Sequence, residues 1–470
     1  MNTNTLREKL VTLDFHAVHN AKKHLEWQEY QNVERVHMTT ENTDDQYKIG
    51  TRCLTGGYTA SSGQPRQIPI IQSTTFKYDT SEQLGDLFDL KAAGYFYSRL
   101  QNPTCDNVAA RICNLEGGSV AMLTSSGQAA NFLAVLNIAT AGDHVISSAS
   151  IYGGTFNLFA ATMSKMGIEF TFISPECTAE EIQAAFRPNT KLIFGETLAN
   201  PALAVLDIEK FANVAHKNEV PLIVDNTFPT PILCNPIKWG ADVVTHSTTK
   251  YMDGHGGAIG GAIIDSGNFD WMANAEKFPG LSTPDETYHG IVYGESFGQG
   301  GAYITKATVQ LMRDLGVCQA PQNAFYLAIG LESLHLRMKE HVKNGLAVAE
   351  FLEKHPAITW VNYPGLKGSN QHDLATKYMP NGCSGVISFG VKGGREAAGK
   401  FMAALNLIQI ATHVADARSC ILHPANSTHR QLNNEQLEAC GVKPDMIRLS
   451  CGIEDARDLI KDIENALSEI

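Results

Sequence analysis

Short apolar runs alternate with amphipathic stretches between residues 119 and 247. The runs that we predict as strands are SVAMLTS, DHVISSA, IEFTFIS, KLIFGET, VPLIVDN and ADVVTHS. Between them, apolar residues recur at helical spacing, as in QAANFLAVLNIA and in the segment that follows Asp207. TAEEIQAAF begins with Thr178 and Glu181 at the spacing of a capping box. The alternation predicts an α/β fold with a mainly parallel sheet that is covered by helices on both faces.

The pattern changes after the last of these strands. Residues 268–322 are irregular and rich in glycine and aromatic residues, and a long helical pattern begins near Pro321. Beyond it, GVISFGV and DMIRLSC are typical of strands, whereas REAAGKFMAAL and IEDARDLIKDIENALSEI are typical of helices. We therefore predict a large domain over residues 102–320 and a smaller C-terminal α+β domain over residues 321–470.

The N-terminal residues follow neither pattern. Residues 1–46 are mostly polar and only weakly helical, so we interpret them as an N-terminal extension. Met38 begins a segment that itself resembles a natural start, which suggests that residues 1–37 are a loose extension or a misassigned start. The first residues lack the apolar core of a signal peptide.

Composition narrows the possible partners. The chain of 470 residues has 43% hydrophobic and 18% charged residues and a net charge of −12, which argues against nucleic acid as a partner. No apolar run is long enough for a transmembrane helix. The 10 cysteines and 16 histidines show neither a CxxC pair nor an HExxH motif, so we expect no metal site and a cytoplasmic protein with reduced thiols.

Three features lie where predicted strands end, which is where α/β sheets bind ligands. Gly127 and Gln128 open a helix after a strand, and such a terminus either binds an anion or is simply capped. Asp225 ends a very apolar strand and needs a cation or a hydrogen-bond donor. Lys250 is either a solvated loop residue or a ligand, and it is flanked by the hydroxyls of Ser247 and Thr249 and followed by glycines.

Together these features suit one ligand. A phosphate site, a carboxylate for a ring nitrogen and an amine for a carbonyl describe pyridoxal phosphate. The glycine-rich GGAIGG does not compete as a nucleotide motif, because it follows the lysine instead of opening a strand–helix turn.

A family resemblance agrees with this interpretation. The motifs YFYSRLQNPT, TSSGQAA, IYGGTFNLF, ETLANP, VDNTFPTP, HSTTKYMDGHG and IRLSCGIED together resemble the Cys/Met-metabolism family of fold type I pyridoxal-phosphate enzymes. The resemblance extends from about residue 47 to the C-terminus. It implies a fold type I transferase, in which residues 47–101 form an arm that reaches the neighbouring subunit.

The resemblance also implies roles for single residues. Lys250 would bind the cofactor covalently and transfer protons, Asp225 would pair with its ring nitrogen, and Tyr152 would stack on its ring. Tyr97 and Arg99 would enter the neighbouring subunit's site, where Tyr97 would assist proton transfer. The remaining implied contacts are phosphate ligands, a group near the cofactor's phenolic oxygen and a binder of the substrate carboxylate: Gly127, Gln128, Ser247, Thr249 and Arg99; Asn200; and Arg448.

The expected reaction is γ-replacement on an activated homoserine. The insertion GLSTPDETYHGIVYGE, the segment ILHPANSTHRQL and Gly154 resemble the branch of the family that replaces the acetate of O-acetyl-L-homoserine by sulfide or a thiol. Methionine or cystathionine γ-lyase activity and a non-catalytic binding protein remain the alternatives. His413 departs from the serine that lyases commonly have there. The resemblance further implies a homo-oligomer, a dimer at least and a tetramer by family analogy.

Overall fold

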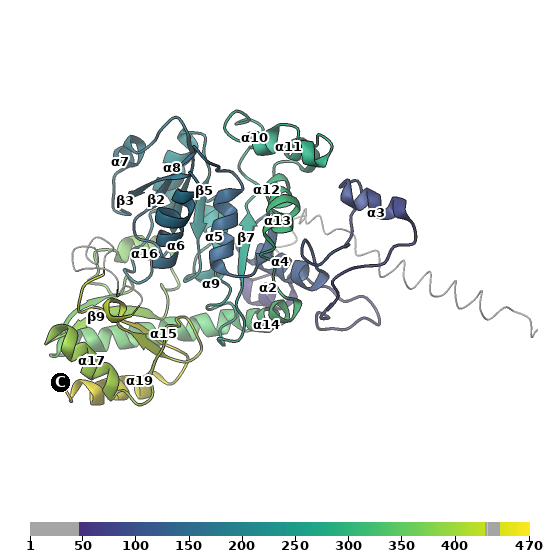
Figure 1. The fold of residues 1–470 in the computed structure, drawn as a ribbon. Helices are drawn as coiled ribbons and strands as arrows, with labels where there is room; N and C mark the ends of the chain where they lie inside the picture. Colours follow the sequence, from purple (N-terminus) through teal and green to yellow (C-terminus); the bar gives the residue numbers. More distant parts are fainter. Residues whose placement is uncertain (1–46, 428–429, 431–441) are drawn as a thin grey trace, which may run out of the picture.

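The computed structural model describes residues 47–427, 430 and 442–470. The expectations for residues 1–37 and for Met38 therefore lie outside the described residues. Two sheets organise the fold, one of seven strands and one of five. The second sheet lies with the C-terminal helices at one end of the molecule (Figure 1).

The larger sheet has the strand order β1-β7-β6-β5-β4-β2-β3. Strands β2 to β6 pair in parallel, and β7 runs antiparallel to both of its neighbours, β1 and β6. The bounds are β1 Val120–Thr124, β2 His144–Ser148, β3 Glu169–Ile173, β4 Thr190–Glu196, β5 Leu222–Asp225, β6 Val243–His246 and β7 Gly261–Asp265. The six predicted strands and the mainly parallel sheet are thus confirmed.

Strand β7 was not predicted. It begins at Gly261, inside the glycine-rich segment that follows Lys250 and that we did not assign to a strand. A Cβ at Gly261 would lie 2.3 Å from the carbonyl oxygen of Ser126. Glycine is therefore needed where β7 passes the segment between β1 and the helix that follows it. Because glycine is uncommon in strands, the composition of this segment does not predict a strand.

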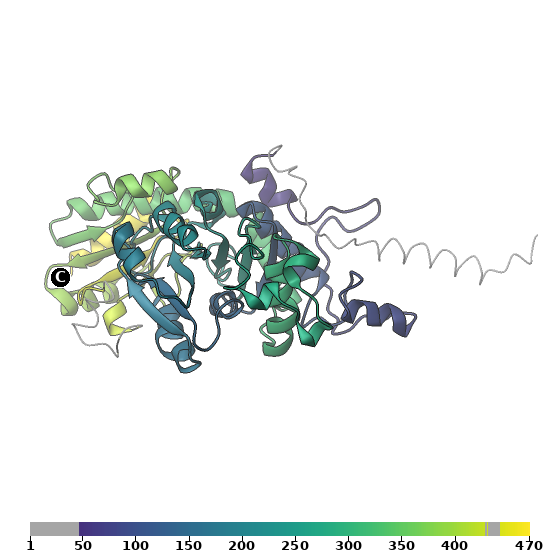
Figure 2. The same ribbon diagram turned by 90° about the horizontal axis from the view of Figure 1, so that it is seen from above.

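Both faces of this sheet are buried. In β5, Leu222 and Val224 belong to one hydrophobic cluster and Ile223 belongs to the other. Because side chains of a strand alternate between faces, β5 reads as a continuous apolar run. Figure 2 shows helices on both sides of the sheet. The helical segments of this region are α4 Pro103–Glu116, α5 Gly127–Leu136, α6 Gly153–Asn157, η2 Leu158–Met163, α7 Ala179–Ala184, α8 Ile208–Lys217, α9 Thr230–Leu233, η3 Pro236–Trp239, α10 Pro279–Ser282, η4 Glu286–Tyr288, α11 Tyr293–Phe297, α12 Ala302–Lys306, η5 Ala307–Met312 and α13 Arg313–Leu315.

Side chains close several helix ends as the sequence predicted. Thr178 accepts the N–H of Glu181, and the Glu181 side chain accepts the N–H of Thr178, so the predicted capping box is confirmed. Ser126 caps α5 by accepting the N–H of Ala129 at 3.1 Å. This cap leaves the first N–H groups of α5 free to point at a ligand.

The smaller sheet has the order β10-β11-β12-β9-β8 and its own hydrophobic cluster. The predicted long helix begins at Pro321 but divides at Ser333 into α14 and α15. The bounds are α14 Pro321–Glu332, α15 Leu334–Lys354, β8 Ile358–Asn362, α16 His372–Tyr378, β9 Val386–Val391, α17 Gly394–Ala404, β10 Gln409–Ile410, β11 Cys420–Leu422, η6 Pro424–Asn426, β12 Ile447–Ser450 and α19 Ala456–Leu467.

The first described residues form two helices, of which the first packs on the body of the molecule through the buried Cys53. The helices are α2 (Ile49–Thr55) and α3 (Ser81–Phe88), and α3 stands away from the body of the molecule in both ribbon views (Figures 1 and 2). A segment held out in this way has the geometry of an arm. That it reaches a neighbouring subunit stays a prediction.

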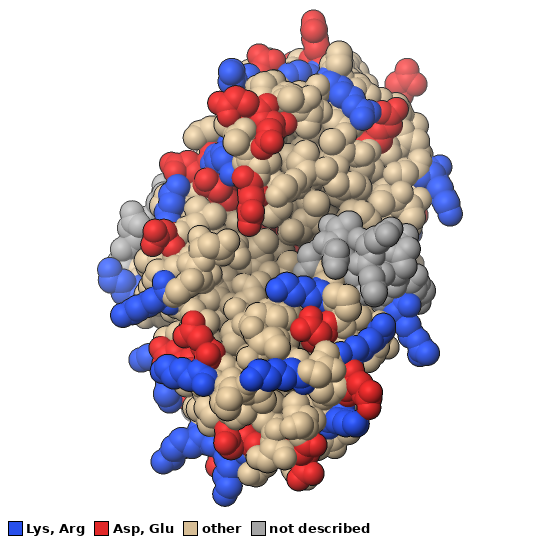
Figure 3. Space-filling view, turned by 90° about the vertical axis from the view of Figure 1, so that its left-hand side faces the viewer, with Lys and Arg blue, Asp and Glu red and all other residues tan. Residues whose placement is uncertain are grey.

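The surface carries charges of both signs. On the face seen in Figure 3, acidic and basic side chains are interspersed. Within the described residues, no helix is both long enough and apolar enough to cross a membrane. None of the cysteines in the same residues is joined in a disulfide, and no group of three or more His, Cys, Asp or Glu residues there could hold a metal ion.

Candidate active site

The C-terminal ends of the central parallel strands bring polar side chains together. In the sheet register, Glu196 at the end of β4 lies beside Asp225 at the end of β5, and Asp225 lies beside Thr245 in β6. The Asp225 side chain is held by three donors. The N–H and the hydroxyl of Thr227 donate to Oδ1 at 3.0 and 2.5 Å, and Nδ2 of Asn131 donates to Oδ2 at 3.1 Å. A carboxylate has about four acceptor sites, so one remains for a further donor.

Lys250 lies beyond the end of β6, in a turn where its N–H donates to the carbonyl of Ser247. Among the described residues its ammonium group makes no hydrogen bond and no ion pair. Burial and then the nearby Arg448 guanidinium lower the pKa of Lys250 to about 8. About a tenth of the side chain is therefore a neutral amine at pH 7, far more than for an exposed lysine, and this is the form that attacks a carbonyl.

The N-terminus of α5 faces this turn. A Cβ at Gly127 would lie 2.5 Å from Cβ of Ser247, so only glycine allows the two segments to approach this closely. The Ser247 N–H donates to the hydroxyl of Thr227, which ties the turn to the Asp225 cluster. Gly127 and Ser247 thus lie together beside the free N–H groups of α5, as an anion site requires.

Two more of the predicted phosphate ligands, Thr249 and Gln128, already have hydrogen-bond partners. The Thr249 hydroxyl donates to the carbonyl of Gly260 at 3.2 Å and accepts its N–H at 3.1 Å. The Gln128 amide donates to the carbonyl of Gly154 and accepts from Thr155. Gln128 therefore has its backbone N–H to offer, whereas the Thr249 hydroxyl must turn from Gly260 to donate to a phosphate.

Tyr152 lies at the start of α6. Its N–H donates to Oε2 of Glu196 at 2.7 Å, and its side chain is 46% exposed. The ring lies against Gly154, since a Cβ at Gly154 would come within 2.5 Å of ring atom Cε1. An exposed aromatic ring that is anchored at its backbone beside Glu196 is available to cover a planar ligand.

Arg448 is a residue of the smaller domain that lies at the site. It lies in β12 and is buried, with Nη1 3.3 Å from Oδ1 of Asn200 and Nη2 donating to the carbonyl of His413 at 2.9 Å. Its Nε has no partner among the described residues. Burial lowers the pKa of Arg448 from its usual value. A buried guanidinium with an open donor needs an anion, and a carboxylate matches its geometry.

His413 lines the same region. Its Nε2 is buried without a hydrogen-bond partner among the described residues and lies 3.7 Å from Oδ2 of Asp416. Burial and then the charge of Lys250 lower the pKa of His413, which places the imidazole near the lysine.

Tyr97 and Arg99 do not join this cluster within the chain. Both are exposed, and the guanidinium of Arg99 lies over the ring of Tyr97, with Cζ 5.0 Å from the ring centroid. Arg99 also donates to the carbonyl oxygen of Arg313. These two residues thus lie at the surface within the predicted arm, residues 47–101, and their contacts do not join the hydrogen-bond network around Asp225.

Sequence reasoning missed the residues that hold the predicted ones in place. Asn131 and Thr227 bind Asp225, and neither was singled out. The signal for Asn131 was present, because it is a polar residue within the apolar helix QAANFLAVLNIA. A buried polar residue in such a helix requires a partner, and the end of a neighbouring strand supplies it.

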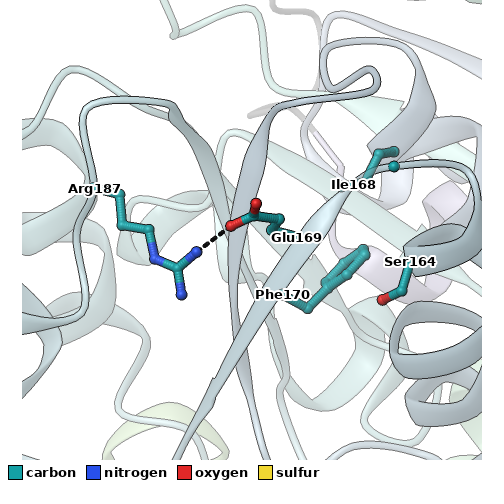
Figure 4. Close-up of a pocket in the computed structure, with 6 residues that line it drawn as sticks. Ser164, Ile168, Glu169, Phe170 and Arg187 are labelled. Atoms are coloured by element: carbon teal, nitrogen blue, oxygen red, sulfur yellow. Dashed lines mark hydrogen bonds and ion pairs between the residues drawn. The ribbon is translucent and has the colours of Figure 1, made fainter.

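A separate hollow of about 460 Å³ lies at the edge strand β3. Its lining is Ser164, Gly167, Ile168, Glu169, Phe170 and Arg187, none of which is a predicted site residue. Figure 4 shows Glu169 pointing toward Arg187, with which it forms an ion pair. Both charges in the hollow are therefore paired with each other.

The residues at the strand ends fit pyridoxal phosphate. The open acceptor on Asp225 suits a protonated ring nitrogen, and the unpaired Lys250 amine suits the aldehyde. The N-terminus of α5 beside Ser247 suits the phosphate. The fit depends on buried groups that lack a full set of partners within the described residues.

Comparison with known proteins agrees. A model of the family described as Cys/Met metabolism PLP-dependent enzyme matches residues 50–468. The O-acetyl-L-homoserine sulfhydrylase of Leptospira meyeri is 43% identical over 439 residues, which cover 92% of this chain and 99% of that protein. The homocysteine synthase of Schizosaccharomyces pombe is 44% identical over 403 residues, covering 86% of this chain and 94% of that protein.

A solved structure extends the agreement to the fold. The protein named O-acetylhomoserine (thiol)-lyase from Campylobacter jejuni, which carries N'-pyridoxyl-lysine-5'-monophosphate, has a TM-score of 0.86 and 38% identity. The match covers 90% of this chain and 100% of that one. The fold type I architecture and the pyridoxal-phosphate cofactor expected from the sequence are thereby confirmed. With a family model that spans nearly all of its described residues, this chain belongs to the Cys/Met metabolism family of PLP-dependent enzymes.

Proposed function

We propose that the protein replaces the acetate of O-acetyl-L-homoserine by sulfide, or by a thiol, to give L-homocysteine, or methionine, and acetate. The observation that carries the proposal is the pair of relatives at 43% and 44% identity, whose names are O-acetyl-L-homoserine sulfhydrylase and homocysteine synthase. In each case the match extends over nearly the whole of both proteins. The open groups at the strand ends supply the chemistry that such a reaction needs.

The proposed roles follow from where the groups lie. Bound pyridoxal phosphate withdraws electrons from the substrate's α-carbon. Lys250 holds the cofactor covalently and moves protons at Cα and Cβ, because its lowered pKa makes the amine a base near neutral pH. Asp225 accepts the ring N–H through its remaining acceptor site and keeps that nitrogen charged.

The other contacts bind and orient. The N–H groups of Gly127 and Gln128, with the hydroxyls of Ser247 and Thr249, bind the phosphate. Tyr152 would cover the cofactor ring, and Asn200 would lie near its phenolic oxygen. Arg448 binds the substrate's α-carboxylate through Nε, the donor that has no partner among the described residues.

We also propose that two chains share each site. Tyr97 and Arg99 are exposed on their own chain, and Arg99 would complete the phosphate site of the neighbouring one. Tyr97 would assist proton transfer there. A closed dimer is the minimum assembly, and we propose a tetramer built from two dimers. The proposal includes a cytoplasmic location, which the free thiols of the described cysteines suit.

One assay tests the reaction. The purified enzyme is incubated with O-acetyl-L-homoserine and sulfide, and homocysteine and acetate are measured; equal amounts of the two are expected. Methionine alone is offered in parallel, and no 2-oxo acid is expected from it. Release of a 2-oxo acid without incorporation of sulfide would make the protein a γ-lyase instead. No turnover of either substrate would favour a binding protein.

A further inference from the structure

Asn131 is a buried residue that donates a hydrogen bond to the Asp225 carboxylate. It lies in α5, on the helix that begins with Gly127, and is 2% exposed. Its Nδ2 donates to Oδ2 of Asp225 at 3.1 Å, and its Oδ1 accepts the hydroxyl of Thr245 at 2.6 Å. Since a carboxylate only accepts, the amide nitrogen of Asn131 must be the atom that faces Asp225.

A second branch leads from Asn131 to the predicted phosphate site. Its Nδ2 also donates to the hydroxyl of Thr155 at 3.2 Å, and that hydroxyl donates to Oε1 of Gln128 at 3.0 Å. Gln128 in turn donates to the carbonyl of Gly154, which lies under the ring of Tyr152. The direction of each bond follows from the carboxylate, because the Asn131 amide must donate to Asp225 and to Thr155, and the single hydroxyl hydrogen of Thr155 is then donated to Gln128.

Asn131 thus fills three of its four hydrogen-bonding positions with buried partners from three different elements. Thr227 occupies both acceptor sites of Oδ1 of Asp225, and Asn131 occupies one of the two on Oδ2. The carboxylate has no freedom to turn, and a single acceptor site is left open.

We propose that Asn131 is a positioning residue, which fixes Asp225 so that its one open acceptor site is available to the ring nitrogen of pyridoxal phosphate. The inference rests on the proposed role of Asp225. It adds that the strength of the Asp225 contact depends on an amide in the neighbouring helix. Asn131 touches neither the cofactor nor the substrate in this role.

The test compares two cofactors that differ only at the ring nitrogen. Cofactor-free, full-length protein is titrated with pyridoxal phosphate and with its deaza analogue, in which a C–H group replaces the ring nitrogen, and the two dissociation constants are measured. For the wild type we expect pyridoxal phosphate to bind about 10- to 100-fold more tightly, the range of a hydrogen bond to a charged group. For Asn131→Leu we expect this ratio to fall to about threefold or less, with the affinity for the analogue nearly unchanged.

Two further variants separate positioning from folding. Thr155→Val removes the second branch but keeps the Asn131–Asp225 bond, so its ratio should stay at the wild-type value. If Asn131→Leu does not fold, Asn131→Ser replaces it, because serine keeps a polar group but is too short to reach Asp225. If the serine or leucine variant binds both cofactors more weakly by the same factor, the role of Asn131 is merely structural and the inference is overturned. A variant that retains the full wild-type ratio of dissociation constants would overturn it as well.

Failure of the proposed role of Asp225 has a different signature. In that case the wild type itself would bind the two cofactors equally, and Asp225→Ala would weaken neither one selectively. That outcome would overturn both the role of Asp225 and the inference built on it. Selective binding by the wild type together with an unchanged ratio in the Asn131 variants would overturn the inference alone.

Discussion

The side chain of Glu196 accepts the backbone N–H of Tyr152 at 2.7 Å, while in the sheet register Glu196 lies beside Asp225. Two buried carboxyl groups therefore adjoin each other at the end of the sheet. Burial, and then the Asp225 carboxylate, raise the pKa of Glu196 well above its usual range. Glu196 keeps its proton at pH values where an exposed glutamate has lost it, and still provides the acceptor that anchors Tyr152.

Glu196→Gln should make stability less dependent on pH. Because the native pKa is raised, the wild type gains stability from this group below the unfolded pKa of about 4.3 and loses that gain as pH rises through the native pKa. Glutamine keeps an acceptor oxygen and carries no charge. As pH rises, the free energy of unfolding of the variant should therefore increase relative to that of the wild type, by about 1.4 kcal/mol for each pH unit between the two pKa values.

The measurement is urea unfolding of the two proteins between pH 5 and pH 8. Glu180→Gln is the control, since hydrogen bonds at the start of α7 lower the pKa of this exposed glutamate. Because its native pKa lies below the usual value, Glu180 is ionised in both the native and the unfolded state above pH 5, and this variant should run parallel to the wild type in that range. Parallel curves for Glu196→Gln and the wild type would show that Glu196 is ionised in the native state.

Gly154→Ala should displace the ring of Tyr152. The added Cβ would lie 2.5 Å from Cε1, and the ring is the end of a flexible side chain, so it turns away while the backbone stays. We expect kcat/KM for O-acetyl-L-homoserine to fall about threefold to tenfold, the range of a lost aromatic stacking contact. Gly399→Ala in α17 is the control, because its Cβ would meet nothing within 4 Å. Unaltered activity of Gly154→Ala would mean that the ring position is unimportant.

Covalent attachment of the cofactor should depend on pH through Lys250. Only the neutral amine reacts, and the pKa of Lys250 is about 8 because of burial and the charge of Arg448. The attachment rate in cofactor-free protein should therefore rise with pH and level off above about 8. Arg448→Gln removes the cation, so the levelling should move to higher pH; Arg457→Gln, an exposed arginine paired with Asp455, should leave it in place. Stopped-flow absorbance measures the rate. If the pH at which the rate levels off is the same in Arg448→Gln as in the wild type, the proposed effect of Arg448 on the pKa of Lys250 is contradicted.

The strands and the identity of the cofactor were predictable because each depends on local pattern. Asp225 ends an apolar run and Lys250 follows one, so parallel pairing places both at the same edge of the sheet. The supporting contacts were not predictable in this way. Asn131 reaches Asp225 across 94 residues, and which face of α5 meets β5 is settled by packing, not by spacing.

Two features that the sequence did not predict have a physical cause in close approach. Strand β7 begins with a glycine that the neighbouring Ser126 carbonyl requires, and its composition therefore reads as a loop. The hydroxyl of Thr249, which the motif assigns to phosphate, is bonded to the backbone of Gly260. A sequence motif identifies the residue at a position, but it does not show which other groups the fold places within hydrogen-bonding distance of that residue.

Glu116→Ala should destabilise the large domain strongly. Glu116 is 1% exposed and accepts from His246 Nε2 at 2.6 Å, from Asn226 Nδ2 at 2.9 Å and from Asn235 Nδ2 at 3.2 Å. Removing the carboxylate leaves the buried His246 Nε2 without this partner and takes one acceptor from each of the two amides, which retain backbone acceptors. We expect a cost of about 3–5 kcal/mol in the free energy of unfolding. Denaturant unfolding measures the loss. Glu169→Ala, which breaks an exposed ion pair with Arg187, is the control and should cost less than about 1 kcal/mol; equal losses would contradict the argument.

Sharing of the site between chains predicts rescue by mixing. Arg99→Ala and Lys250→Ala are each expected to be nearly inactive, because each removes a group that every site needs. In a mixed dimer, one site receives both defects and the other receives Lys250 from one chain and Arg99 from its partner. Random pairing makes about half of the dimers mixed, and each of these has one whole site of two, so co-expression should restore about a quarter of wild-type activity.

The control mixes two variants whose changed residues come from the same chain in each site. Lys250→Ala mixed with Asp225→Ala leaves every site lacking one of the two groups, because both come from the same chain in each site. No rescue is expected from this pair. Equal activity of the two mixtures, or the absence of rescue in the first, would place Arg99 outside the partner's site, and its contacts with Tyr97 and Arg313 would then be its whole role.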